Sequence, residues 1–321
     1  MIVPTLLKLG CKHFFVSNCD EGRKLRLITG NKTNIYVLHG IFLDELKIFV
    51  YHNLIPVLNN LRQIHIWQNY ANSLNLQLPC LIHIDTGMHR LGIQEAELKQ
   101  LNLDIHTKNL NILYIISHLI ASVNIQSSNN DIQLKLFKKL SKKFINSSKS
   151  LANSSGVFLG PSYHFELVRV GAAIYGINPT PYMNHSVIKP VASLYAPIIQ
   201  INSLPPQKTV GYHGIYTNTS KTSRTIATIP IGYVDGFLQN FSKKGYVMIS
   251  GYKAPIIGAI SMDLTIIDVS EVPKHLTFLE QKVELLGTDL PIDKLATLHD
   301  TSEYKILASL GLQKYKRYII E

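Results

Sequence analysis

The first half of the chain alternates short apolar runs with segments of helical spacing. Seven runs are predicted to be strands: HFFVS (13–17), IYVLHG (35–40), IHIW (64–67), LIHID (81–85), LYIISH (113–118), LANSSG (151–156) and LVRVG (167–171). Between them lie amphipathic segments such as DEGRKLRLI, LDELKIFVYH, NYANSLNL and EAELKQLNL. Apolar strands separated by amphipathic helices are typical of a parallel sheet, and this many units predict a (β/α) barrel.

The pattern changes near Pro190. SLYAPIIQINSL, TVGYHGIYTN, RTIATIPIGYV, GYVMISG, APIIGAISMDLTIIDVS and KVELLG read as strands, and Gly, Pro, Ser and Asn turns separate them. Short strands with such turns predict an antiparallel β domain. We therefore expect a (β/α) barrel domain over residues 1–187 and a β domain over residues 188–321.

Composition indicates a globular protein. Hydrophobic residues make up 46% of the 321 residues and charged residues 17%, and no apolar run is long enough to span a membrane. The N-terminus lacks the basic region and cleavage site of a signal peptide. The three cysteines, Cys11, Cys19 and Cys80, have no metal-type spacing. We expect reduced thiols, a cytoplasmic location, no metal site and no membrane partner.

The net charge of +11 raises the question of a nucleic-acid partner. However, the basic residues are scattered, and their densest groups are LKLFKKLSKK and QKYKR. The first group lies on a predicted helix whose apolar face comprises Ile132, Leu136, Phe137, Leu140 and Phe144. A solvent-exposed helix face explains these lysines better than a basic surface that binds nucleic acid, so no nucleic acid is expected as a partner.

The stretch HIDTGMHRLGI, at 83–93, is unusual for a loop that follows a buried strand. Asp85, Gly87, Arg90 and Gly92 crowd into it, whereas an ordinary surface turn needs one or two turn formers. The two glycines that flank Met-His-Arg indicate a tight turn that holds the arginine in a defined position. An ordinary surface turn remains the alternative at this point.

Further polar residues follow other predicted strands. They are His118 after LYIIS, Asn153 and Ser154 after SLA, and Arg169 within LVRVG. In a barrel, the carboxyl ends of the strands meet at one mouth, where active sites are built. His118 alone would suggest a buried core histidine, but four such positions favour a site. NSSG and RVGAAIYG also offer small residues whose backbone N–H groups suit a phosphate.

These motifs resemble alanine racemases, which are pyridoxal-phosphate (PLP) enzymes. The matches run in order along the chain: HIDTGMHRLGI, SHL, ANSSG, RVGAAIYG, GYHGIYT, IPIGYVDGF, GAISMDLTIIDV and SEYKIL. The resemblance implies a (β/α)8 TIM-type barrel, here without its first strand, followed by a mainly antiparallel β domain. It also implies PLP as the cofactor, alanine as the substrate, and a homodimer with shared active sites.

The resemblance assigns roles on the barrel side of the site. Arg90 would reach the PLP phenolic oxygen and the substrate carboxylate region, and a guanidinium suits this because it is a rigid fork of donors. Arg169 would pair with the pyridine nitrogen. Because arginine does not give up its proton, the ring would remain a weaker electron sink, which limits side reactions. His118 would link Arg169 to Tyr212.

The remaining roles concern the phosphate and the substrate entrance. Ser154, Gly171 and Ala172, with Asn153 beside them, would bind the phosphate, and Tyr304 would close over it. Met262 and Asp263 would place a backbone N–H against the substrate carboxylate, and Tyr233 would narrow the entrance.

Racemisation needs a proton carrier on each face of one carbon. Tyr212 would be the base for L-alanine, entering the site from the second subunit, and the product D-alanine would supply peptidoglycan. The other base in the family is the Schiff-base lysine, in a segment like KANAYGHG on the first strand. This chain has no such segment, and Lys8 and Lys12 lack the motif. A mis-assigned start codon or a disrupted gene explains this better than an evolved variant.

Two smaller departures and two alternatives remain. His83 stands where many relatives have a lysine that braces the arginine of DTGM, and SVN replaces an acidic residue near the entrance. His83 could support Arg90 as a neutral acceptor or through an anion. The alternatives are a racemase for another small amino acid such as serine, and a non-catalytic PLP-binding dimer, which the missing lysine favours.

Overall fold

The computed structural model describes residues 2–181, 188–237, 241 and 245–310. These residues form two compact units. The first contains the residues up to Gly171 and those around Pro179, and the second contains Ala172–Asn178 and the described residues from Ile188 onward. The predicted domain boundary lies between residues 187 and 188. Residue 187 is outside the described ranges, so this boundary stays a prediction.

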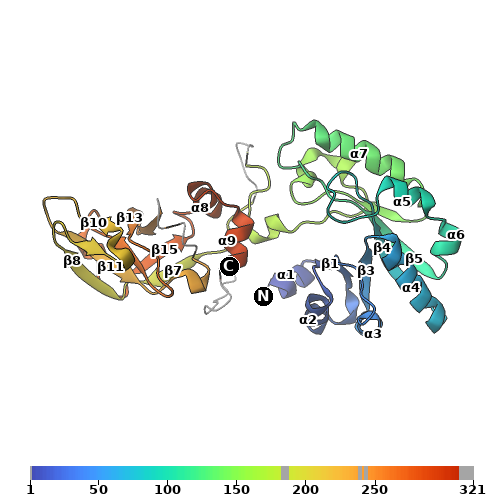
Figure 1. Cartoon of the computed structure of the whole chain (residues 1–321), viewed down its shortest axis with the longest axis horizontal. Helices are drawn as coiled ribbons and strands as arrows, with labels where there is room; N and C mark the ends of the chain where they lie inside the picture. The colour runs from blue at the N-terminus through green and yellow to red at the C-terminus, as the bar shows by residue number, and fades with distance from the viewer. Residues whose placement is uncertain (1, 182–187, 238–240, 242–244, 311–321) are drawn as a thin grey trace. The chain divides into compact units, whose positions relative to one another are not determined.

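The first unit is built on a parallel sheet of six strands in chain order (Figure 1). The strands are β1 (His13–Val16), β2 (Asn34–Val37), β3 (Leu54–Leu58), β4 (Leu78–His83), β5 (Leu110–Ile116) and β6 (Ser148–Ser150). The helices are α1 (Ile2–Lys8), α2 (Cys19–Thr29), α3 (Leu46–Tyr51), α4 (Leu61–Leu74), α5 (Glu95–Gln100), α6 (Leu103–His106) and α7 (Ser128–Ser141). Within the described residues, β1 and β6 are the edges of this sheet, so the barrel-type fold is confirmed as an open part of a barrel.

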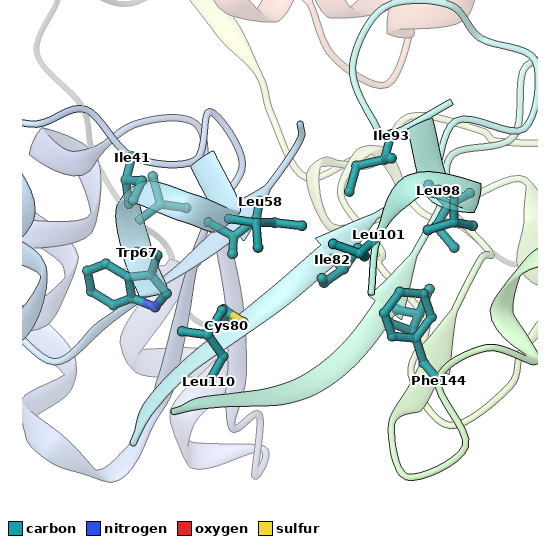
Figure 2. Close-up of a cluster of buried hydrophobic side chains, with 14 of the residues drawn as sticks. Ile41, Leu58, Trp67, Cys80, Ile82, Ile93, Leu98, Leu101, Leu110 and Phe144 are labelled. Carbon is teal, nitrogen blue, oxygen red and sulfur yellow. The ribbon is translucent and has the colours of Figure 1, made fainter. Parts of the chain in front are cut away.

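Both faces of this sheet are buried, which explains the continuous apolar runs. In β3, Leu54 and Leu58 belong to the larger core cluster, while Ile55 and Val57 point into a smaller cluster on the other face. Figure 2 shows the larger cluster, in which Trp67 of α4 lies beside the central strands. Asn60 begins α4 because its side chain accepts a hydrogen bond from the Gln63 backbone N–H at 2.9 Å.

Three strand predictions in this unit are wrong or displaced. Residues 64–67 lie inside α4, where Ile64, Trp67 and Ala71 are buried at helical spacing, and the strand is β3 instead. Residues 167–171 form no strand, although Arg169 makes one isolated bridge to Asn153. Residues 151–155 follow β6 as a loop, and Gly156 begins a 3-10 turn, Gly156–Leu159. Four residues are too few to distinguish the periodicity of a helix from that of a strand, which explains why residues 64–67 were predicted to be a strand.

The second unit is a β domain, as predicted. Its sheet of seven antiparallel strands has the order β7-β15-β12-β13-β14-β11-β8. The strands are β7 (Leu194–Pro197), β8 (Gln200–Leu204), β11 (Arg224–Ile229), β12 (Tyr246–Ile249), β13 (Tyr252–Ile257), β14 (Thr265–Asp268) and β15 (Lys282–Leu286). A two-stranded ribbon of β9 (Thr209–Val210) and β10 (Tyr216–Thr217), and the helices α8 (Ile292–Leu298) and α9 (Glu303–Ser309), complete it. Across the described ranges, no helix is long and apolar enough to cross a membrane.

Candidate active site

The loop after β4 is organised by the carboxylate of Asp85. Its Oδ1 accepts hydrogen bonds from the backbone N–H groups of Gly87 (2.9 Å), Met88 (3.0 Å) and His89 (3.2 Å). Burial opposes the charge of Asp85, but these donors and the nearby His89 lower the pKa of the carboxyl overall. The buried carboxylate thus folds the Gly-Met-His triplet around itself and leaves Arg90 exposed on the loop.

Gly92 closes this loop where two backbones approach closely. The backbone N–H of Asp85 donates to the Ile93 carbonyl at 3.0 Å, and that of Ile93 donates to the His83 carbonyl at 2.8 Å. A Cβ on Gly92 would lie 2.7 Å from the Asp85 nitrogen, and φ is +106° there. The second glycine of the motif is therefore required by the backbone.

A buried polar network joins this loop to the loop after β5. Thr86 and Ser117 share a hydrogen bond of 2.7 Å between their hydroxyls. Gln133 of α7 donates to the Thr86 hydroxyl (3.0 Å) and to the His118 carbonyl (2.9 Å), and its oxygen accepts from the Ile120 N–H (2.9 Å). Helix α7 thus fixes the segment that carries His118.

Arg169 is held by backbone carbonyls at the carboxyl ends of β5 and β6. One terminal nitrogen donates to the carbonyl (2.9 Å) and hydroxyl (2.6 Å) of Ser150, and the other donates to the carbonyls of Ser117 and Leu151. Its guanidinium carbon lies 6.0 Å from the ring centroid of Phe15. Burial lowers the pKa of Arg169 to about 10, so the residue remains a cation at neutral pH.

Two histidines share this electropositive region and are neutral. Burial, together with the charges of Arg169 and Arg90, lowers the pKa of His118 to about 4. Burial lowers the pKa of His83 to about 3, where the charges of Arg169, His118 and Arg90 act in the same direction and Asp85 opposes them. His83 at the end of β4, and Arg90, His118 and Arg169 on three separate loops, therefore act on one another electrostatically.

The residues predicted to bind phosphate also come together. The Ser154 hydroxyl accepts a hydrogen bond from the Gly171 backbone N–H at 3.0 Å. A Cβ built on Gly171 meets no atom within 4 Å, so a ligand can approach this backbone. Ala172 follows at the start of a 3-10 turn, Ala172–Tyr175. The oxygen of Asn153 is used within the loop, where it accepts from the Ser122 hydroxyl and the Gly156 N–H, both at 2.9 Å.

This arrangement fits a group that combines a phosphate with an aromatic ring. Space is open at Gly171, whose backbone N–H donates to the Ser154 hydroxyl, and Arg169 offers a fixed cation. Lys8, in the last turn of α1, and Lys12, just before β1, lie at the amino end of the first strand. Neither is at the carboxyl end of a strand, where these residues gather.

The second unit brings together three other predicted residues. Tyr212 is 69% exposed and lines a hollow with Gly211, Ala259 and Ser261. The Tyr233 N–H donates to the Ser261 carbonyl, and the Val234 N–H donates to the Met262 carbonyl, both at 3.1 Å.

Tyr304 lies on α9 and is exposed. The Ser309 hydroxyl at the end of this helix donates to the Gly236 carbonyl at 3.2 Å, which ties α9 to the turn that carries Tyr233.

Sequence reasoning missed Asn59 and Gln133. Asn59 follows β3 directly, and its side-chain oxygen lies 2.8 Å from Nδ1 of His83. Because β3 was not predicted, the asparagine at its carboxyl end had no place in the sheet. Gln133 lies within the predicted lysine-rich helix and has no predicted role, whereas its side chain is buried and makes three hydrogen bonds.

An open barrel sheet with cationic and phosphate-suited residues at its strand ends, together with an antiparallel β domain, defines a class of two-domain barrel enzymes. The chain belongs to the alanine racemase family. The model of the alanine racemase N-terminal domain matches residues 1–179, and that of the C-terminal domain matches residues 191–319.

Individual relatives support this family assignment. The chain is 46% identical over 318 residues to alanine racemase of Rickettsia bellii (strain RML369-C), covering 98% of this chain and 77% of that protein. It is 44% identical over 321 residues to alanine racemase of Rickettsia akari (strain Hartford), covering 100% of this chain and 88% of that protein. Among solved structures, Bartonella henselae alanine racemase with covalently bound pyridoxal phosphate is 34% identical, with a TM-score of 0.93, covering 98% of this chain and 87% of that one.

Proposed function

We propose that this chain binds PLP and interconverts L-alanine and D-alanine by a two-base mechanism. The observation that carries the proposal is the fixed guanidinium of Arg169, which lies with two neutral histidines and Arg90 at the carboxyl ends of the parallel strands. Membership of the alanine racemase family and the likeness to a PLP-bound structure support it.

PLP, when bound, supplies an electron-withdrawing ring that makes the α-proton of the amino acid acidic. The Ser154–Gly171 corner, with Ala172, would hold the phosphate, and Tyr304 would cover it. Arg169 would face the pyridine nitrogen as a permanent cation. Arg90 would hold the phenolic oxygen and the carboxylate region of the substrate.

Proton transfer on the L-alanine face is assigned to Tyr212, which His118 would connect to Arg169. Met262 and Asp263 would direct a backbone N–H to the substrate carboxylate, and Tyr233 would narrow the entrance. We propose that Tyr212 acts in the site of a second subunit, so that the active form is a homodimer. The exposure of Tyr212 beside a hollow supports this placement.

The second base requires the Schiff-base lysine, and residues 1–321 contain no segment like KANAYGHG. A non-catalytic PLP-binding dimer is the second candidate. With the lysine segment joined ahead of Ile2, the proposed product, D-alanine, would serve peptidoglycan synthesis in the cytoplasm.

Absorbance spectroscopy and a D-alanine assay separate the two candidates. Purified 1–321 should bind PLP weakly and lack the absorbance band of PLP bound covalently to lysine. A version that carries the lysine strand of a family member ahead of Ile2 should show the band and racemise alanine. A borohydride-reducible band on Lys8 or Lys12 of the unextended chain would contradict the assignment, and an extended protein with the band but no racemisation would favour the non-catalytic dimer.

A further inference from the structure

The segment that leads to Arg169 runs beside β6, the outer strand of the parallel sheet. The Glu166 backbone N–H donates to the Lys149 carbonyl at 3.2 Å. Three residues further on, the Arg169 backbone N–H donates to the Ala152 carbonyl at 2.9 Å. Both bonds follow one register, so this segment covers the edge of β6 and the loop after it, although it is not a strand.

Lys149 is the residue of β6 whose backbone faces this outer edge. The next residue, Ser150, faces β5, because its carbonyl accepts from the Ser117 N–H at 3.2 Å. The Lys149 N–H donates to Oε2 of Glu166 at 2.7 Å, while the Lys149 carbonyl accepts from the Glu166 N–H. A carboxylate is a strong acceptor for a backbone N–H at a sheet edge. Glu166 thus binds both backbone groups of Lys149.

The chain just before Glu166 turns sharply and is attached to α7. Phe165 has a φ of +52°, a left-handed conformation that is costly for a bulky residue. Its ring lies edge-on to that of Phe137, with the centroids 5.3 Å apart. The buried Tyr163 donates from its hydroxyl to Oδ1 of Asp131 at 2.7 Å. The costly turn is therefore held from both sides, by α7 before it and by β6 after it.

The placement of Arg169 depends on where this turn ends. Its guanidinium contacts carbonyls at the carboxyl ends of β5 and β6, and among them is that of Ser150, the residue after Lys149. A side chain reaches such fixed carbonyls only from a backbone position that is itself fixed. Glu166 supplies that position, because it joins the segment to Lys149 three residues before the arginine.

We propose that Glu166 is a positioning residue for Arg169: by binding both backbone groups of Lys149, it fixes the segment that carries the guanidinium to the strand ends. The carboxylate acts here as an acceptor for an N–H, so the amide oxygen of glutamine can replace it. The use of Arg169 toward PLP rests on the proposed function, whereas the placement of its guanidinium does not.

Nitrogen-15 NMR of the arginine-labelled chain 1–321 observes this guanidinium directly, with Arg169→Lys used for assignment. The two terminal nitrogens contact different groups, so they should give separate resonances in the wild type. Glu166 is exposed, so Glu166→Ala should fold, and it should broaden or merge these resonances. Glu166→Gln should keep them separate. Unchanged resonances in Glu166→Ala, or a glutamine variant as disturbed as alanine, would overturn the proposal.

Glu97→Ala is the matched control. Oε2 of Glu97 also accepts a backbone N–H, from Gln94 at 3.2 Å, but it does so at the start of α5. This variant therefore loses the same kind of bond in the same unit, and the Arg169 resonances should stay as in the wild type. Equal disturbance by Glu97→Ala and Glu166→Ala would show a general loss of stability and contradict the positioning role.

Pyridoxine 5′-phosphate connects this placement to the proposed function, because it has the ring nitrogen and the phosphate but no aldehyde. Calorimetric titration should give a Kd about threefold to tenfold higher for Glu166→Ala than for the wild type, the scale of one hydrogen bond. Glu166→Gln and Glu97→Ala should stay near the wild type. Equal affinity in Glu166→Ala would contradict the proposal. If the wild type does not bind this probe, the proposed function fails, while the NMR outcomes still decide the placement of Arg169.

Discussion

At the scale of the residue, the loop that carries Arg90 depends on backbone contacts that only glycine allows. Gly92 and Gly160 have the same φ of +106°, but only Gly92 lies against another backbone segment. Alanine at Gly160 should cost about 1–2 kcal/mol in the free energy of unfolding, from its backbone conformation alone. Alanine at Gly92 should cost about 2–4 kcal/mol, because the Asp85 backbone must also move. Urea unfolding of both variants measures the difference, and equal losses would show that the close approach is unimportant.

Also at this scale, the neutral histidines make stability depend on pH. The pKa of His118 is about 4 in the folded chain, against 6.5 for an ordinary histidine, so its contribution is complete above about pH 6.5. As the pH falls from 6.5 toward 4, the unfolded chain takes up a proton that the folded chain does not, and stability is lost. His118→Gln should flatten this part of the pH profile, whereas His65→Gln, on the exposed side of α4, should not. Parallel profiles for wild type and His118→Gln in chemical denaturation would refute this.

At the scale of the element, the sequence predicted most of the strands and the change from parallel to antiparallel pairing. Strand prediction failed where the apolar run was very short, or where contacts with residues far away in the sequence determine the structure. IHIW reads equally as strand or helix, and only the packing of Ile64 and Trp67 against the sheet decides for α4. LVRVG was read as a strand from its apolar residues, whereas Arg169 contacts carbonyls of Ser150 and Ser117 that lie 19 and 52 residues away. No local pattern contains such partners.

Helix α7 gives the prediction at this scale, because it connects two site loops through Gln133. Gln133→Leu removes three hydrogen bonds and leaves the Thr86 hydroxyl, the His118 carbonyl and the Ile120 N–H without these partners, the first of them in a buried position. The loss should be about 2–3 kcal/mol in the free energy of unfolding. Lys135→Leu, on the exposed side of the same helix, should change it little. The pair is compared by urea unfolding, and a neutral Gln133→Leu would mean that α7 does not hold these loops.

At the scale of the whole molecule, the motifs identified the family correctly, and both family domains match. The roles of the site residues stay proposals, because they concern a bound cofactor and, for Tyr212, a proposed second subunit. Residues in one chain cannot reveal by their spacing that a tyrosine acts in another subunit. The assignment of Tyr212 to the partner's site is therefore the central claim at this scale.

Complementation between two inactive subunits tests that claim most directly. One subunit is the lysine-extended chain with Tyr212→Phe, which has the Schiff-base lysine but lacks the phenol at position 212. The turnover of this variant alone should be about 10²–10⁴-fold lower than that of the extended chain with Tyr212. The other is the chain 1–321, which keeps Tyr212 and has no lysine segment. D-alanine formation is measured in each subunit alone and in purified heterodimers. The account predicts that activity returns in the heterodimer, at one working site per dimer, and confirmed heterodimers without activity, or full activity of the Tyr212→Phe subunit alone, would contradict it.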